Sequence, residues 1–152
     1  KQHEGFLGHS YLGSWVNLGA GTNNSDLKNN YRPVRVYLAG DWVDTGSLFV
    51  GLIMGDHSKC GINTMFNTGT VVGVCCNVFG GGYPPKFIPS FSWGGPGGWE
   101  EYDPERAIVT AQTVMARRGV ALSPQGEEML REVFRLTSEE RTGFLDGPSP
   151  GL

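Results

Sequence analysis

Histidine side chains and one polar loop are the groups in this sequence with the most evident chemistry. Neutral imidazole takes up a proton near pH 7, so His3, His9 and His57 are the side chains with acid–base chemistry in the physiological range. Residues 23–33 (NNSDLKNNYRP) form a polar, asparagine-rich stretch of loop-forming residues. Whether these groups can act together depends on the elements that position them.

Those elements follow a period of six residues. From position 54 the chain divides into MGDHSK, CGINTM, FNTGTV, VGVCCN and VFGGGY, and the earlier pair LGSWVN and LGAGTN has the same layout. Each unit begins with a bulky apolar residue, glycine usually follows, and the fifth residue is small or β-branched. The bulky column contains Met54, Cys60, Phe66, Val72 and Val78, and the fifth column contains Ser58, Thr64, Thr70 and Cys76.

Short strands separated by tight corners explain this period, and a parallel β-helix is the fold that they predict. Each hexad forms one flat side of a three-sided coil, the bulky residue points inward, and glycine relieves crowding at the bend. Successive coils then stack about 4.8 Å apart through backbone hydrogen bonds. An ordinary β-sandwich with glycine-rich turns is the alternative fold.

The columns also interpret the cysteines. Cys60 and Cys76 fall in core columns, whereas Cys75 should face outward. The number of cysteines is odd and none forms a CxxC pair, so we expect neither a disulfide framework nor a metal site. His9 and His57 lie outside the apolar columns, and we expect a functional role for neither.

The rest of the chain divides by composition. Solenoids carry their insertions on one face, often the binding face, so the loop is the first candidate for a site. Two helices should start at Asp103-Pro104 and Ser123-Pro124, where an N-cap residue precedes proline. The predicted parts are a β-helix at 1–83 with the loop at 23–33 and further coils at 36–53, a proline-, glycine- and aromatic-rich connector at 84–102, two helices within 103–137, and a flexible tail at 138–152.

Composition limits the partners. A net charge of −3 and a pI near 5.6 argue against nucleic-acid binding. No apolar run approaches the roughly 20 residues that cross a bilayer, and the first residues do not resemble a signal peptide. We therefore expect no membrane partner and a cytoplasmic protein.

The segment GFLGHSYLGSWVNLGAGT resembles the acetyltransferase domain of the bifunctional N-acetylglucosamine-1-phosphate uridyltransferases and glucosamine-1-phosphate acetyltransferases. The segments TNNSDLKNNY and GDHSKCGINTMFNTGTVVG are similar to those of sugar nucleotidyltransferases with the same layout, and the resemblance covers roughly residues 1–90. It implies a left-handed parallel β-helix, a homotrimer, and sites for acetyl-CoA and a sugar phosphate between neighbouring subunits. It also implies a preceding domain that binds the nucleotide substrate and Mg²⁺, so we expect this chain to be a piece of a longer transferase.

The resemblance assigns roles to single residues. His3 aligns with the catalytic histidine, and Asn17 with an asparagine that contacts the sugar. Ala20 aligns with a residue whose backbone meets the acetyl group, Arg32 with a lysine near the phosphosugar, and Ser47 with a serine at the coenzyme.

The sequence departs from the family at two places. Phe6 replaces a tyrosine that binds the sugar phosphate, and the family's Asn-Tyr pair becomes Asp26-Leu27 in an ungapped alignment. A four-residue slip restores that pair as Asn30 and Tyr31, and both alignments stay open. Acetyl transfer to an amino-sugar phosphate is the leading functional hypothesis, and the alternative is a catalytically silent β-helix that oligomerises or regulates a nucleotidyltransferase.

Overall fold

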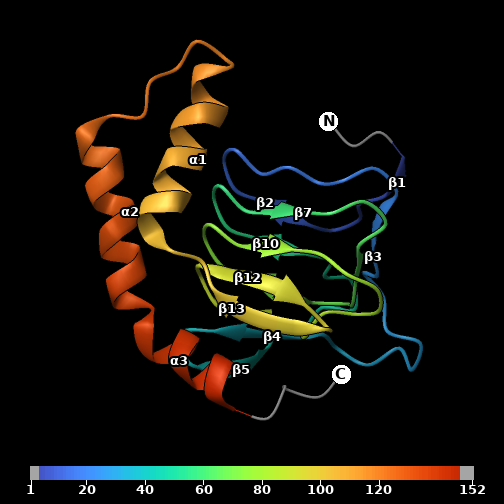
Figure 1. Ribbon diagram of the computed structural model, residues 1–152. Helices are drawn as coiled ribbons and strands as arrows, with labels where there is room; N and C mark the ends of the chain where they lie inside the picture. The colour runs from blue at the N-terminus through green and yellow to red at the C-terminus, as the bar shows by residue number, and fades with distance from the viewer. Residues whose placement is uncertain (1–3, 148–152) are drawn as a thin grey trace.

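The computed structural model describes residues 4–147 and shows a parallel β-helix with three helices along one of its corners (Figure 1). The strands of the coil are β1 (Gly5–Phe6), β2 (Tyr11–Leu12), β3 (Thr22–Asn24), β6 (Ile53–Met54), β7 (Lys59–Cys60), β8 (Met65–Phe66), β9 (Val71–Val72), β10 (Asn77–Val78), β11 (Phe87–Ile88) and β12 (Ser92–Gly95). The predicted fold class, a parallel β-helix followed by helices, is confirmed.

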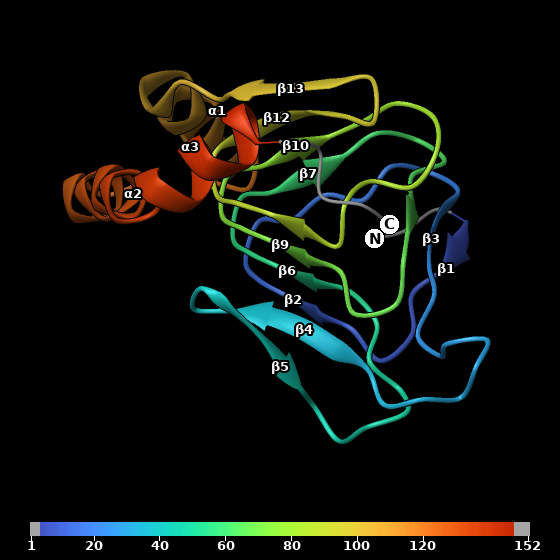
Figure 2. The same cartoon turned by 90° about the horizontal axis from the view of Figure 1, so that it is seen from below.

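The strands form three sheets, here called faces A, B and C. Face A has the order β1-β3-β8, face B β2-β6-β9-β11, and face C β7-β10-β12. Strand β13 (Gly98–Glu101) pairs antiparallel with β12 at the end of face C. Figure 2 shows the three faces as sides of one coil.

Inside the coil lie the two columns predicted from the hexads. The bulky residues Met54, Cys60, Phe66, Val72 and Val78 are each at most 5% exposed. The fifth-column residues Ser58, Thr64, Thr70 and Cys76 are each at most 3% exposed. The interior is therefore built from the side chains that the period of six selects.

The buried hydroxyls of the fifth column close the corners. Four hydroxyls donate to the backbone carbonyl three residues earlier, at 2.7–2.9 Å, whereas Ser58 donates to the Gly73 carbonyl on the next coil. The pairs are Thr22 with Gly19, Thr64 with Gly61, Thr70 with Asn67, and Ser92 with Pro89. A buried hydroxyl without a partner would destabilise the coil, so serine and threonine fill this column because they are small and satisfy the bend at the same time.

Glycine at the start of a corner relieves a close approach between coils. A Cβ atom on Gly73 would lie 2.4 Å from the backbone nitrogen of Ser90, and one on Gly19 would lie 2.3 Å from the carbonyl carbon of Gly61. Neither distance is sterically allowed, which confirms the predicted role of these glycines.

An insertion interrupts the coil between β3 and β6. It contains an antiparallel hairpin of β4 (Arg35–Leu38) and β5 (Asp41–Asp44). The prediction of further coils across 36–53 is therefore wrong for the hairpin, and the chain rejoins face B only at β6. The reason is the Ala39-Gly40 turn, in which both residues have positive φ (50° and 90°), the geometry of a two-residue hairpin loop. Val34 and Val36 from this insertion cover Val71 on the outside of face B.

The coil continues past residue 83, contrary to the predicted boundary and to the connector at 84–102. Strands β11 and β12 pair with β9 and β10 in register, Val72 with Ile88 and Val78 with Gly94. These pairs are 16 residues apart, whereas Met54 and Val72 are 18 apart. The final coil is two residues short, so a strict hexad search loses its phase there.

The predicted helices are α1 (Pro104–Ala116) and α2 (Pro124–Leu136). Each begins as expected: Asp103 accepts a hydrogen bond from the Arg106 amide at 2.8 Å, and Ser123 accepts one from the Gly126 amide at 3.1 Å. Both helices pack on the corner between faces B and C. Cys75 faces outward from the coil as predicted, but the helices cover it, which leaves it 2% exposed in a cluster with Phe91, Ala107, Ile108, Ala111 and Leu130.

A third helix, α3 (Ser138–Asp146), replaces most of the predicted flexible tail. Arg141 anchors it: the side chain is 3% exposed and donates from Nε to Glu101 Oε2 at 2.7 Å. The same guanidinium donates to the Phe134 carbonyl and lies 3.9 Å from the centre of the Phe134 ring. A single buried arginine therefore joins α3 to both α2 and β13, a long-range contact that no local pattern reveals.

Replacing Glu101 with glutamine should lower the free energy of unfolding by about 1–3 kcal/mol, because the buried guanidinium of Arg141 loses its charged acceptor. Urea denaturation measures this change. Glu132→Gln is the matched control, since its pair with Arg135 is exposed, and it should leave the midpoint nearly unchanged. Equal effects in the two variants would contradict the anchoring role of Arg141.

All three cysteines should resist a thiol reagent in the native protein. Each is buried and free, and burial raises the pKa of Cys75 to about 12 and of Cys76 to about 11, so little thiolate forms. Native protein mixed with an aromatic disulfide reagent should release almost no chromophore, whereas denatured protein should titrate as three thiols. One fast-reacting thiol in the native state would mean that the helices do not cover Cys75.

Candidate functional site

The asparagine-rich loop forms a polar cavity of about 310 Å³ against the coil. Its lining consists of Ser25, Leu27, Lys28, Asn29, Asn30, Asn67, Thr68 and Tyr83. Amides, hydroxyls, an ammonium and one aromatic ring thus meet in one place. Such groups donate and accept hydrogen bonds in several directions, as recognition of a polar ligand requires.

The loop is held by a side-chain hydrogen bond to the coil and by hydrogen bonds within the loop itself. Ser25 Oγ lies 2.7 Å from Thr68 Oγ1, and Lys28 Nζ donates to the Pro33 carbonyl at 2.9 Å. Asn30 Oδ1 accepts from the Arg32 amide at 3.2 Å. Of the predicted loop residues, Asn30 lines the cavity, whereas Tyr31 and Arg32 are exposed and do not line it.

Asp26 has a different environment from the rest of the loop. Its Oδ2 lies 2.7 Å from Nδ1 of His9, whose ring stands 5.1 Å from that of Phe49. When His9 carries its proton on Nδ1, the carboxylate orients the ring and Nε2 is left as a free base. The structure therefore supplies a histidine-aspartate pair that the sequence interpretation missed.

A signal for this pair does exist in the sequence. Gly5 pairs with Thr22 and Phe6 with Asn23 on neighbouring coils, an offset of 17 residues. His9 and Asp26 are separated by the same offset, so the first coil places them side by side. Reading the histidine against its coil neighbour, rather than against the apolar columns, would have found the pair.

Asn17 and Ala20 lie away from the loop. Asn17 bridges to Lys59 on face C, its side chain is exposed, and it lines a cavity of about 420 Å³ with Trp15, Lys59, Arg117 and Arg118 among others. The Ala20 carbonyl accepts from the Asn63 amide at 2.8 Å at the following corner. Neither residue meets Asp26, Asn30, Tyr31 or Arg32 within one chain.

The remaining two predicted site residues are Ser47 and His3. Ser47 follows the hairpin and is exposed, and its Oγ accepts from the Phe49 amide at 3.3 Å while its carbonyl accepts from the Val34 amide at 2.9 Å. His3 lies outside the described residues. Within residues 4–147, no group of three or more histidine, cysteine or acidic side chains could hold a metal ion. In the same range, no helix has the length and apolar character needed to span a membrane.

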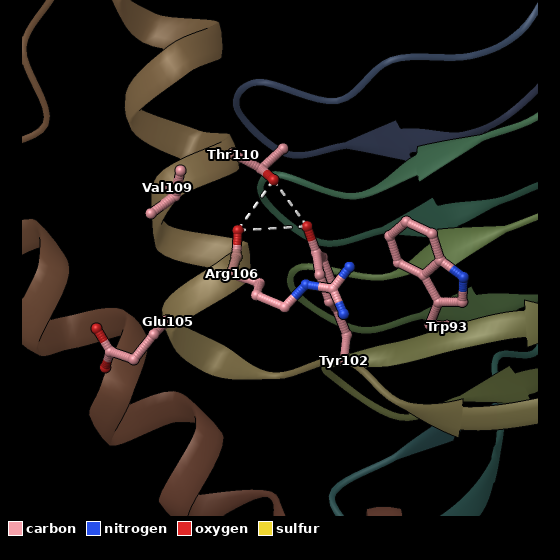
Figure 3. A pocket seen from close by; sticks show the side chains of 6 residues that line it. All are labelled: Trp93, Tyr102, Glu105, Arg106, Val109 and Thr110. Atoms are coloured by element: carbon pink, nitrogen blue, oxygen red, sulfur yellow. Dashed lines mark hydrogen bonds between the residues drawn. The ribbon is translucent and has the colours of Figure 1, made fainter.

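Another cavity, of about 450 Å³, lies between face C and the start of α1 (Figure 3). Tyr102 and Thr110 face each other there, with the two hydroxyl oxygens 2.8 Å apart, and Thr110 also donates to the Arg106 carbonyl at 3.0 Å. The Tyr102 ring meets Trp93 edge to face at 4.8 Å. The two hydroxyls already bond to each other and to backbone, so we interpret this contact as the clamp that fixes α1 on face C.

Comparison with known proteins supports the predicted homology to bifunctional transferases over about half of the chain. No family model matches. A bifunctional sugar-1-phosphate nucleotidylyltransferase/acetyltransferase of Sulfurisphaera tokodaii is 29% identical over 79 residues, which are 52% of this chain and 20% of the relative. The bifunctional protein GlmU of Methanocaldococcus jannaschii is 34% identical over 74 residues, 49% of this chain and 18% of the relative. The chain thus spans about a fifth of the length of these relatives and is homologous to bifunctional transferases there.

Replacing Thr68 with valine should loosen the loop, because Ser25 Oγ loses its partner on the coil. We expect a loss of about 1 kcal/mol in unfolding free energy and faster proteolysis within residues 25–33. Thr113→Val is the control, since its hydroxyl bonds only within α1, to the Val109 carbonyl. Unchanged cleavage of the loop in the Thr68 variant would show that other contacts hold it.

Proposed function

We propose that this chain is the acetyl-transferring part of a sugar-1-phosphate nucleotidyltransferase and moves an acetyl group from acetyl-CoA to the amine of an amino-sugar phosphate. The observation that carries the proposal is the polar loop cavity, which lies in a chain similar to bifunctional transferases over half its length. Nucleotidyl transfer, with its Mg²⁺, then belongs to residues outside this chain.

The reaction requires a base for the amine. The ammonium form of the sugar first loses one proton to solvent. The base takes the second proton as the amine nitrogen forms a C–N bond with the thioester carbonyl carbon, the C–S bond then breaks, and the base passes this proton to the departing coenzyme thiolate. Family resemblance assigns the base to His3, whereas the contact between His9 and Asp26 offers a second candidate with an orienting carboxylate.

The sugar phosphate is expected to meet loop residues. Asn30 and Lys28 line the cavity, and Tyr31 and Arg32 follow them in the loop as exposed residues outside its lining. Asn17 would contact the sugar, and Ala20 and Ser47 would line the thioester. These residues come from different sides of the coil, which supports a site completed by a neighbouring copy.

A homotrimer would provide that neighbour. Face A presents Phe6 and Met65, 52% and 39% exposed, on either side of Asn23 in one ladder. Apolar side chains exposed together on a sheet favour contact with another protein surface. We propose that contact through face A brings the loop of one subunit toward Asn17 of its neighbour. The buried free cysteines are consistent with the cytoplasmic setting proposed for this enzyme.

Thiol release from acetyl-CoA in the presence of glucosamine 1-phosphate tests the reaction on the full chain. His3→Ala and His9→Ala should be assayed separately, and the variant that removes the base should lose roughly 10²–10⁴-fold in rate. Arg135→Gln, on the far helix, is the activity control. No release by the unaltered chain, with a trimer by light scattering and no coenzyme binding by calorimetry, would favour a silent oligomerisation scaffold.

Mixing variants tests the shared site. Asn17→Ala and Asn30→Ala should each be weakly active alone, because each removes one half of the proposed site. Unfolded together and refolded as hybrids, the two variants should regain part of the activity, since some interfaces then combine intact halves. Activity that stays at the level of the separate variants would place both residues in one subunit's site, or outside it.

A further inference from the structure

We propose that the cavity between face C and the C-terminal end of α1 is a binding site for a phosphate-bearing ligand. The cavity includes Asn17, so this inference deepens the proposed function and rests on it for the choice of ligands, whereas phosphate binding itself can be measured without acetyl transfer. The cavity has a volume of about 420 Å³, within the range of small-molecule sites.

Three cations converge on this cavity. Lys59 comes from β7 on face C, and Arg117 and Arg118 follow the last turn of α1. Among residues 4–147, none of the three forms an ion pair with a carboxylate. By contrast, Arg131 and Arg141 on the neighbouring helices are each paired with glutamate. The three positive charges are therefore uncompensated by the protein itself.

Lys59 is held in a state that an anion would stabilise. It is half-buried, and its Nζ donates to the His57 carbonyl at 2.7 Å, which fixes the ammonium and leaves two further donor hydrogens. Burial lowers the pKa of Lys59, the mark of a cation that has lost water without gaining a carboxylate. A phosphate oxygen would restore the missing interaction.

The two arginines are carried by a helix whose position is fixed in advance. Tyr102 and Thr110 clamp α1 to Trp93 on face C (Figure 3). Trp93 pairs with Asn77, and Asn77 with Lys59, so the clamp lies two rungs, about 10 Å, from the lysine. The arginines therefore reach the cavity without rearrangement of the coil, and pre-positioned groups bind more tightly than mobile ones.

The other lining groups suggest what the phosphate is attached to. Trp15 provides an aromatic face, and Asn17 provides an amide that both donates and accepts. Guanidinium groups match the oxygens of a phosphate. A ring bearing a phosphate fits this combination, and it has two sources: a sugar phosphate, or the phosphorylated nucleoside of a coenzyme or nucleotide.

Titration calorimetry on the full chain tests the site with inorganic phosphate, glucosamine 1-phosphate, ADP and coenzyme A at fixed ionic strength. Lys59→Met should weaken binding of the phosphorylated ligands roughly tenfold or more, and Arg117→Gln with Arg118→Gln should weaken it further. Arg106→Gln is the matched control, because Arg106 is an unpaired cation of the same helix outside this cavity. It should bind like the unaltered chain.

Tighter binding of glucosamine 1-phosphate than of ADP and coenzyme A would identify the acceptor as the ligand, and the reverse order would identify a nucleotide or coenzyme. Absence of binding by any phosphorylated ligand, or equal binding by the arginine variants and the unaltered chain, overturns the proposal. The arginines are exposed and their loss should not unfold the protein, so this arm is decisive even if Lys59→Met does not fold. A chain that releases thiol but does not bind phosphate here contradicts this inference alone, and one that binds phosphate without releasing thiol contradicts only acetyl transfer.

Discussion

The hydrogen bonds from buried hydroxyls to the backbone carbonyls at the bends are the constraint on which the rest of this structure depends. A coil with short sides buries its bends, and the carbonyls of those bends need donors. Thr22, Thr64 and Thr70 supply them from the fifth column, where a larger side chain would collide with the bulky column. Because the coils stack strand on strand, residues one coil apart lie in register, and distant parts of the sequence become lateral neighbours.

This register explains where chemistry can arise. His9 meets Asp26, Ser25 meets Thr68, and Asn17 meets Lys59, each pair joining neighbouring coils. The insertion and the helices then add groups outside the coil at two separate places. The result is an amide-lined cavity at the loop and a cationic cavity beneath α1, which share one rigid support but face different directions.

The sequence predicts the interior well because the interior repeats. The bulky and small columns, the crowded glycines and the two capped helices all follow from local patterns, and the structure confirms them. Local patterns miss features that occur only once in the chain. These are the two-residue deletion before Ile88, the Ala39-Gly40 turn, and the burial of Arg141 against Glu101. The outward orientation of Cys75 is predictable but its burial is not, since only the docking of the helices covers its corner. At the candidate site, sequence similarity points to Asn17 and Asn30, but it cannot show that they lie on different sides.

Strand β13 has a consequence for the behaviour of the molecule in solution. A stack of parallel rungs ends in open hydrogen-bonding groups, which invite further chains to add and form a fibre. Here the chain reverses at the last rung, and β13 runs antiparallel with Glu100 and Glu101 exposed along it. An incoming strand on face C would meet the reversed direction of β13 and the exposed Glu100 carboxylate, while Glu101 is paired with Arg141, so the β13 edge of face C is protected against the addition of further rungs.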